Sequence, residues 1–195
     1  MSAPPVLLDR RLVILELLRD RGDLLIVSGL GGTSWDVASC GDDPANFYLW
    51  GGMGSAVPLG LGLALAQPDR TVLVVTGDGE MLMGIGALAT VAAQRPTNLA
   101  IAVMDNERYG ETGGQLTHTT LGADLAAMAR GAGLSAAVQL HDIESVGAWR
   151  DALRSARTPA FASIKVAHAN APLVLPPRDG VLLQQRFRGA LGLAS

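Results

Sequence analysis

The chain has 195 residues, of which 49% are hydrophobic and 17% are charged, a composition typical of a folded domain and not of a disordered chain. The formal net charge is −3 and the basic residues form no block, so charge gives no support for nucleic-acid binding. The single cysteine, Cys40, excludes an internal disulfide framework, a Cys-ligated iron–sulfur cluster and a Cys₄ zinc site. We therefore expect a protein of the reducing cytoplasm.

A membrane span is not expected either. The longest stretch without a charged side chain covers residues 44–68, but Asn46, Pro58 and several glycines interrupt it. A membrane-spanning helix needs about 20 predominantly apolar residues in a row. The pattern favours a buried, glycine-rich helix.

Segments with helical spacing alternate with short apolar runs along the chain. We predict helices at residues 7–19, 55–67, 80–94, 121–130 and 143–156 and from residue 181, and strands at residues 24–27, 47–49, 71–76, 99–104, 136–138 and 160–165. This alternation indicates a doubly wound α/β fold with a mainly parallel sheet. We expect a single domain over residues 1–195, with its core at about 8–167 and a C-terminal tail at 168–195.

Ligands of such sheets bind at the carboxyl ends of the strands, which directs attention to the loops at residues 29–34, 77–80 and 105–115. The first of these loops is rich in glycine and invites comparison with a dinucleotide-binding turn. It lacks the full Gly-x-Gly-x-x-Gly spacing, and no matching acidic residue follows on a second strand. A dinucleotide-binding domain is therefore disfavoured.

Gly77-Asp78-Gly79 ends the clearest predicted strand and opens a helix. Glycines at such a point let the backbone approach a phosphate, which the helix N-terminus also favours. The Asp78 carboxylate would repel that phosphate unless a hard cation such as Mg²⁺ lay between them. The alternative interpretation is that Asp78 is an ordinary helix cap.

Asn106 follows Asp78 after one predicted helix and one predicted strand. If the two strands are neighbours, both side chains reach the same edge of the sheet. A carboxylate, an amide oxygen and a loop carbonyl then form a set of hard ligands that leaves room for phosphate oxygens and water.

Gly77-Asp78-Gly79 with Asp105-Asn106 resembles the thiamine-diphosphate (ThDP) motif, in which Gly-Asp-Gly is followed by Asn-Asn or a similar pair. Segments at residues 52–56, 86–90 and 112–115 carry the resemblance further. Over about residues 8–167 the chain is similar to the diphosphate-binding domain of ThDP-dependent 2-oxo acid decarboxylases, especially sulfopyruvate and phosphonopyruvate decarboxylases. This implies decarboxylation of a small 2-oxo acid to an aldehyde and CO₂.

The resemblance also implies ligands. Mg²⁺ would be bound by the side chains of Asp78 and Asn106 and by the backbone carbonyl of Arg108. Met53 would hold ThDP in its bent shape, and the Gly51 carbonyl would accept from the aminopyrimidine. The residues expected to bind the cofactor are Gly32, Thr33, Ser34, Gly51, Met53, Gly77, Asp78, Gly79, Glu80, Asn106 and Tyr109. Glu80 departs from the family, which commonly has a small residue there, and Tyr109 stands where the phosphonopyruvate enzyme has His.

Two further residues are candidates for proton transfer. Glu111 lies near the place where related decarboxylases have an acid–base group, and it would protonate the carbanion left after CO₂ departs. His118, in the same polar loop, would assist it. The alternative for both is a solvated loop side chain. Arg108 is the place to look for the counter-charge to a second anionic group of the substrate.

ThDP chemistry needs a glutamate on a second domain, the pyrimidine domain, and 195 residues hold only one such domain. The resemblance therefore implies a hetero-oligomer in which a separate pyrimidine-domain subunit supplies that glutamate. Two alternatives stay open. One is a subunit of another ThDP enzyme, a carboligase or a 2-oxo acid oxidoreductase. The other is a non-catalytic ThDP-binding regulatory subunit.

Overall fold

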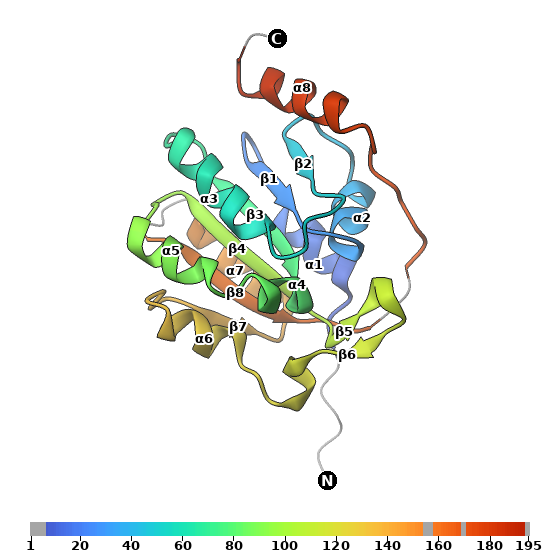
Figure 1. Ribbon diagram of the computed structural model, residues 1–195, viewed down its shortest axis with the longest axis vertical. Coiled ribbons are helices and arrows are strands. Elements are labelled where there is room, and N and C mark those ends of the chain that lie inside the picture. The colour runs from blue at the N-terminus through green and yellow to red at the C-terminus, as the bar shows by residue number, and fades with distance from the viewer. Residues whose placement is uncertain (1–6, 154–157, 169–170, 194–195) are drawn as a thin grey trace.

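The computed structural model describes residues 7–153, 158–168 and 171–193 (Figure 1). Its main sheet has six strands in the order β2-β1-β3-β4-β8-β7, and every neighbouring pair is parallel. The strands are β1 (Leu25–Ser28), β2 (Asn46–Tyr48), β3 (Val72–Gly77), β4 (Leu99–Asp105), β7 (Val138–Leu140) and β8 (Ala160–Lys165). The predicted parallel α/β fold is confirmed.

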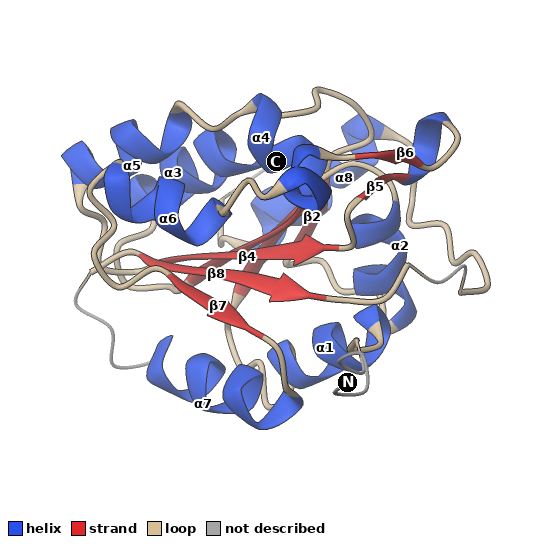
Figure 2. Ribbon diagram, turned by 90° about the horizontal axis from the view of Figure 1, so that it is seen from below, coloured by secondary structure: helices blue, strands red, loops and turns tan. Residues whose placement is uncertain are grey.

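Helices cover both faces of this sheet, as Figure 2 shows. On one face lie α3 (Ala56–Ala66), α4 (Asp78–Met83), α5 (Ala87–Gln94) and α6 (Leu125–Gly131). On the other face lie α1 (Arg10–Leu17), α2 (Gly32–Ser39) and α7 (Ile143–Leu153). In the described part of the chain, no helix combines the length and apolarity needed to cross a membrane.

The central strands are apolar because both of their faces are buried. In β3, Val72 and Val74 pack into the cluster under α3 and α5, whereas Leu73 and Val75 pack into the cluster under α1 and α2. All four side chains are fully buried. Continuous apolar runs are the expected signature of such strands. The burial of β3 and β4 fixes the position of their carboxyl ends, from which the loops that begin at residues 77 and 105 emerge.

Two local predictions need correction. Residues 29–34 were expected to form a turn, but α2 begins within them at Gly32, after Gly31 has reversed the chain in a left-handed conformation (φ 73°). Residues 80–94 were expected to form one helix, but they form α4 and α5 with a break between them. At the break Gly84 lies directly against the carbonyl of Gly54, where no side chain would fit. The predicted continuation of α7 to residue 156 lies outside the described residues.

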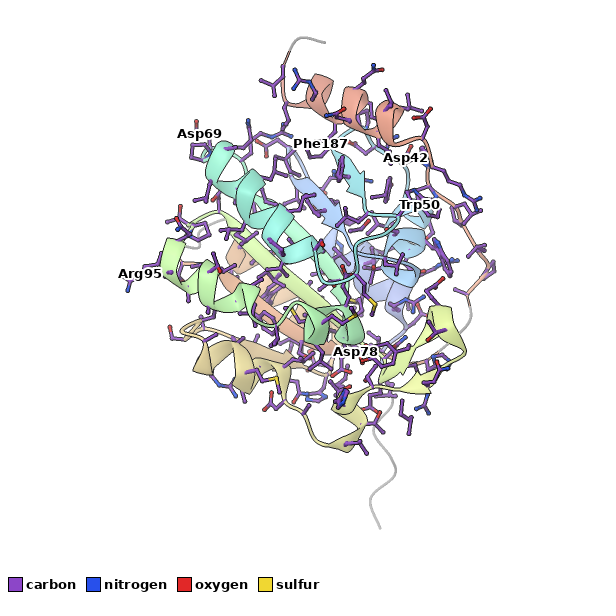
Figure 3. The ribbon with its side chains drawn as sticks, viewed as in Figure 1. Asp42, Trp50, Asp69, Asp78, Arg95 and Phe187 are labelled. Atoms are coloured by element: carbon purple, nitrogen blue, oxygen red, sulfur yellow. The ribbon has the colours of Figure 1, made fainter. Side chains whose placement is uncertain are left out.

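The C-terminal segment packs against the edge of the sheet. Helix α8 (Gly180–Ala190) crosses strand β2 (Figure 1), and the rings of Phe47 and Phe187 meet edge to face at 5.4 Å. Before α8, the indole of Trp50 donates to the carbonyl of Pro177 at 2.7 Å. Figure 3 shows Trp50, Asp42 and Phe187 on this side of the molecule. The edge of β2 is thereby covered, which removes a site for unwanted strand pairing.

Candidate cofactor site

A cavity of about 320 Å³ lies at the carboxyl ends of β1, β3 and β4. Three loops that are far apart in sequence meet there, as the parallel topology predicts. Its lining comprises Arg10, Leu30, Gly32, Thr33, Trp35, Met53, Gly77, Asp78, Gly79, Glu80, Met104, Asn106, Arg108, Tyr109, Gly110, Glu111, Thr112, His168 and Ala171. Most of the residues expected at the site are in this set, and their roles as ligands stay predictions.

Asp78 is the first residue of α4, directly after β3, and only 1% of its surface is exposed. Figure 3 labels Asp78 at the start of this helix. Its Oδ2 accepts hydrogen bonds from the hydroxyls of Thr117 and Thr119. Burial raises the pKa of Asp78, while the hydrogen bond from Thr117 opposes this effect. Such a desolvated carboxylate is a strong candidate for pairing with a cation.

The loop after β4 turns sharply at Glu107, so that Asn106 and Arg108 face the cavity and Glu107 does not. Glu107 adopts a left-handed backbone conformation (φ 62°), and the Asn106 side-chain oxygen accepts from the Arg108 amide at 3.0 Å. Asn106 and Arg108 line the cavity, whereas the Glu107 carboxylate pairs with Lys165 at 2.7 Å. The Asn106 oxygen keeps a second lone pair for another partner.

The loop continues as a short hairpin, β5 (Arg108–Tyr109) and β6 (Gln115–Leu116), joined by a 3₁₀ turn (Gly110–Thr112). Residues 105–120, which the sequence left without assigned structure, therefore project beyond the sheet and return to Asp78 through Thr117. Tyr109 lies so close to Gly79 that a Cβ at Gly79 would collide with its ring. The second glycine of the motif is thus required for close packing of this loop.

Glu80 lines the cavity, and only 5% of its surface is exposed. Its Oε2 accepts from the Thr76 hydroxyl at 2.8 Å and from the Leu30 amide at 3.2 Å. A side chain at Gly29 would overlap this carboxyl group. Burial raises the pKa of Glu80, opposed by the bonds from Thr76 and Leu30. Glu80 therefore joins the loop after β1 to the loop after β3.

Three expected residues are not in the lining. The Ser34 hydroxyl donates to the Gly29 carbonyl at 2.6 Å and lies 2.7 Å from the Ser28 hydroxyl, so it is used inside the fold. Gly51 is exposed, with open space where a Cβ would be. His118 is exposed on a second 3₁₀ turn (His118–Leu121) beyond the cavity. The geometry gives Ser34 and His118 no support as ligands or catalysts.

Glu111, in contrast, reaches back to the loop after β1. A Cβ at Gly31 would lie 2.7 Å from the Glu111 Oε1, so the carboxyl group rests on the Gly31 backbone. Burial raises the pKa of Glu111, and the charge of Arg10 opposes the shift. The sequence interpretation missed Arg10 and His168 as lining residues, since neither lies in a recognisable motif.

The donor set fits a magnesium diphosphate. Asp78, Asn106 and the Arg108 backbone offer a carboxylate, an amide oxygen and a carbonyl, which are hard oxygen ligands. A Cβ at Gly77 would meet nothing within 4 Å, so the backbone there is open to a phosphate-sized group. The described residues hold no group of three His, Cys, Asp or Glu side chains poised for a metal. A metal site in which phosphate oxygens supply some of the ligands does not need three such side chains.

Comparison with known proteins decides the family. Residues 39–166 match the family described as thiamine pyrophosphate enzyme, C-terminal TPP binding domain. The chain belongs to this family. Thiamine pyrophosphate is the same molecule as ThDP, so the predicted family is confirmed.

Among curated relatives, sulfopyruvate decarboxylase subunit beta of Methanothermobacter thermautotrophicus is 38% identical over 165 residues, 85% of either chain. The corresponding subunit of Methanocaldococcus jannaschii is 32% identical over 92% of this chain and 95% of that one. Phosphonopyruvate decarboxylase of Streptomyces viridochromogenes is 42% identical over 144 residues, 74% of this chain but only 34% of that enzyme.

Solved structures confirm the fold. A ThDP-dependent 4-hydroxybenzoylformate decarboxylase of Rhodococcus jostii RHA1 superposes with a TM-score of 0.69 at 20% identity, over 87% of this chain and 34% of that one. A ThDP-dependent enzyme of Mycobacterium smegmatis gives a TM-score of 0.70 at 24% identity, over 83% of this chain and 32% of that one. This chain thus spans about a third of the length of these structures.

Proposed function

We propose that the chain is the ThDP- and Mg²⁺-binding subunit of a split 2-oxo acid decarboxylase, acting on a sulfopyruvate- or phosphonopyruvate-like substrate. The observation that carries the proposal is the meeting of Asp78, Asn106 and the Gly77–Gly79 backbone at one cavity. The 38% identity to a sulfopyruvate decarboxylase subunit along most of both chains supports the substrate class. Acetolactate synthase isozyme 1 of Escherichia coli matches only 31% of this chain, which gives a carboligase less support.

In this proposal Asp78, Asn106 and the Arg108 carbonyl hold Mg²⁺, and the backbone at Gly77 and Thr33 holds the diphosphate, since the Thr33 hydroxyl, like that of Ser34, donates to the Gly29 carbonyl. Met53 supports the bent cofactor. When bound, ThDP supplies an electron sink for the bond that breaks as CO₂ leaves. The chain's own residues position that cofactor and exclude water from it.

Glu111 is the proposed proton donor to the carbon that loses CO₂. Its carboxyl group lies in the cavity wall, and burial raises its pKa above the usual value, which is the direction that favours a proton donor. Arg108 faces the same cavity, and its Nη1 is buried without a hydrogen-bond partner among the described residues. A second anionic group on the substrate would satisfy it.

The proposed enzyme is completed by a second, pyrimidine-domain subunit that supplies the activating glutamate, and the hetero-oligomer works in the cytoplasm. The name "subunit beta" of the relatives supports such a partner. The match covers 85% and 95% of the lengths of these two relatives, but only 34% of the length of phosphonopyruvate decarboxylase. The greater length of phosphonopyruvate decarboxylase leaves room on one chain for the second domain that we assign here to a partner subunit.

The test is to isolate the protein from its own cells with ThDP and Mg²⁺ present and to record native mass spectra. A second chain of similar size with retained ThDP is expected, and the assembly should release CO₂ from sulfopyruvate or phosphonopyruvate. The variant Asp78→Ala should lose both ThDP retention and CO₂ release. Unchanged decarboxylation in that variant would refute the proposal.

Two other outcomes distinguish the alternatives. A new C–C product from two carbonyl compounds, without net aldehyde release, would indicate a carboligase. ThDP binding by an assembly that turns over no 2-oxo acid would indicate a regulatory subunit. Either result would replace the decarboxylase assignment while leaving the cofactor site intact.

A further inference from the structure

Arg10, on the first turn of α1, lies outside every motif that identifies the family and outside the matched residues 39–166. Its side chain nevertheless lines the cavity. A Cβ at Gly32 would lie 2.8–2.9 Å from Nη1, Nη2 and Cζ of Arg10. The outer edge of the guanidinium therefore covers the backbone at the start of α2, and the glycine is what allows this approach.

Asp36 fixes Arg10 in this position. The Asp36 carboxylate is 1% exposed and binds two guanidinium groups, with Oδ2 accepting from Arg10 Nε and Oδ1 from Arg11 Nε at 2.8 Å. Asp36 balances only one of these two cations, and Glu111 is a further carboxyl group on which the charge of Arg10 acts. The Arg10 and Arg11 side chains are only 16% and 22% exposed, so solvent screens the excess positive charge in part and an anion beside Arg10 would be stabilised.

The two arginines use their remaining nitrogens differently. Arg11 donates from Nη2 to the Pro172 carbonyl and is not part of the cavity lining. Arg10 uses only Nε for Asp36, and within the described residues its Nη1 and Nη2 make no hydrogen bond. These two atoms form the fork that binds the oxygens of a phosphate or sulfonate. They also lie at the N-terminal end of α2, where the helix dipole favours negative charge.

We propose that Arg10 is an anion-binding residue of the cavity, which holds a phosphate or sulfonate oxygen with its two Nη atoms while Asp36 positions it. The inference rests on the proposed function, because that function supplies two such anions. One is the cofactor diphosphate and the other is the distal anionic group of the substrate. Glu111, whose pKa the charge of Arg10 affects, faces the same arginine and would adjoin the bound anion.

The experiment compares Arg10→Gln, Arg10→Lys and the matched control Arg11→Gln, each in the complex with the partner subunit. Arg10→Gln and Arg11→Gln each remove one of the two partners of Asp36, and Arg11→Gln also removes the hydrogen bond to the Pro172 carbonyl, so the control perturbs the fold at least as much, but only Arg10→Gln removes a cavity cation. ThDP affinity is measured calorimetrically in the presence of Mg²⁺. KM is measured with sulfopyruvate and with pyruvate, which lacks the second anion. Thermal unfolding of every variant reports its stability.

We expect Arg10→Gln to weaken anion binding by at least about tenfold, Arg10→Lys to restore part of the loss, and Arg11→Gln to stay within about twofold of the wild type. A raised Kd for ThDP identifies the diphosphate as the anion. An unchanged Kd with a raised KM for sulfopyruvate but not for pyruvate identifies the substrate group. Equal behaviour of Arg10→Gln and Arg11→Gln in all these measurements would overturn the inference.

The proposed function can fail separately. If the wild-type complex binds no ThDP, the decarboxylase assignment fails, and titration with inorganic pyrophosphate and Mg²⁺ still tests Arg10. Pyrophosphate binding that is lost in Arg10→Gln and kept in Arg11→Gln would sustain the anion site. Equal binding by both variants would refute it.

Discussion

The carboxylates of Asp78 and Asp105, at the ends of two neighbouring strands, are linked through one hydroxyl group. Thr119 Oγ1 lies 2.8 Å from Asp105 Oδ1 and 3.2 Å from Asp78 Oδ2. The other oxygen of Asp105 pairs with Lys165 at 2.8 Å. Asp105, which occupies the first position of the expected Asn-Asn pair, is thus held inside the fold and fixes the orientation of its neighbour Asp78 instead of facing the cavity.

Because of this linkage we predict that Thr119→Val weakens ThDP binding, although Thr119 is not one of the residues expected to contact the cofactor. Removal of the hydroxyl leaves two buried carboxylates with one donor fewer, which costs about 1–3 kcal/mol. We expect the Kd for ThDP with Mg²⁺ to rise several-fold, measured by quenching of tryptophan fluorescence. Thr119→Ser keeps the hydroxyl and serves as the control. If Thr119→Val bound ThDP as tightly as Thr119→Ser, the linkage would have no role in orienting Asp78.

Glu80 gives a second prediction because its carboxyl group joins two cofactor loops. Glu80→Ala would leave the Leu30 amide unpaired beside a new cavity, and we expect a loss of about 2 kcal/mol in stability. For a chain of this size, that corresponds to a fall of about 4–8 °C in Tm. Hydrogen exchange at the Leu30 amide should accelerate. Glu80→Gln keeps the shape and one accepting oxygen, so it should retain most of the protection. Equal exchange rates in the two variants would contradict this role.

Glu111 and His118 were expected to act together, and the structure separates them. Glu111→Gln should lower kcat by about 10²-fold or more with little change in the Kd for ThDP, because it removes the proposed proton donor and keeps the shape. His118→Asn should leave kcat within about twofold, because its side chain is exposed away from the cavity. Single-turnover measurement of aldehyde formation with the assembled enzyme decides the matter. A large loss in His118→Asn would show that the loop closes over the cavity.

The sheet and the edge that carries the proposed metal site could be predicted because their signals are local. Continuous apolar runs mark buried parallel strands, and Gly77-Asp78-Gly79 and Asn106 follow two of them directly. The sequence could not predict that Arg10 lines the cavity. Its partner Asp36 lies 26 residues away on another helix, and no spacing rule connects an α1 side chain to a strand end.

The same limit applies to polar side chains near the motif. Ser34 follows the glycines of the first loop and has the hydroxyl that a phosphate site needs. The Ser34 side chain is buried against Ser28 because of where β1 lies, and the sequence of the loop does not reveal that position. A residue type at the right place in a motif therefore predicts a contact only when the direction of the side chain is also fixed, as it is for Asp78.

The last prediction concerns the C-terminal helix, where Arg186 binds Asp42 through two hydrogen bonds of 2.6 and 2.9 Å. These bonds lower the pKa of Asp42 below its usual 3.8. A carboxyl group whose pKa is lower in the folded state stabilises the fold above pH 3.8, and this contribution is lost as the pH falls through the folded-state pKa. Because the Asp42 side chain is 41% exposed, we expect only about 0.5 kcal/mol.

Asp42→Asn should accordingly be less stable than the wild type at pH 7, and the difference should shrink as the pH falls from 4 to 3. Urea unfolding followed by circular dichroism measures it, with Asp69→Asn, at an exposed position, as the control. Limited proteolysis of the segment before α8 adds a local readout, since weaker docking of α8 on β2 exposes the residues before Gly180. A difference between wild type and Asp42→Asn that is constant with pH would show that the ion pair does not hold α8. Docking would then depend on the remaining contacts, which include the ring contact between Phe47 and Phe187 and the hydrogen bond from Arg70 to the Ala190 carbonyl.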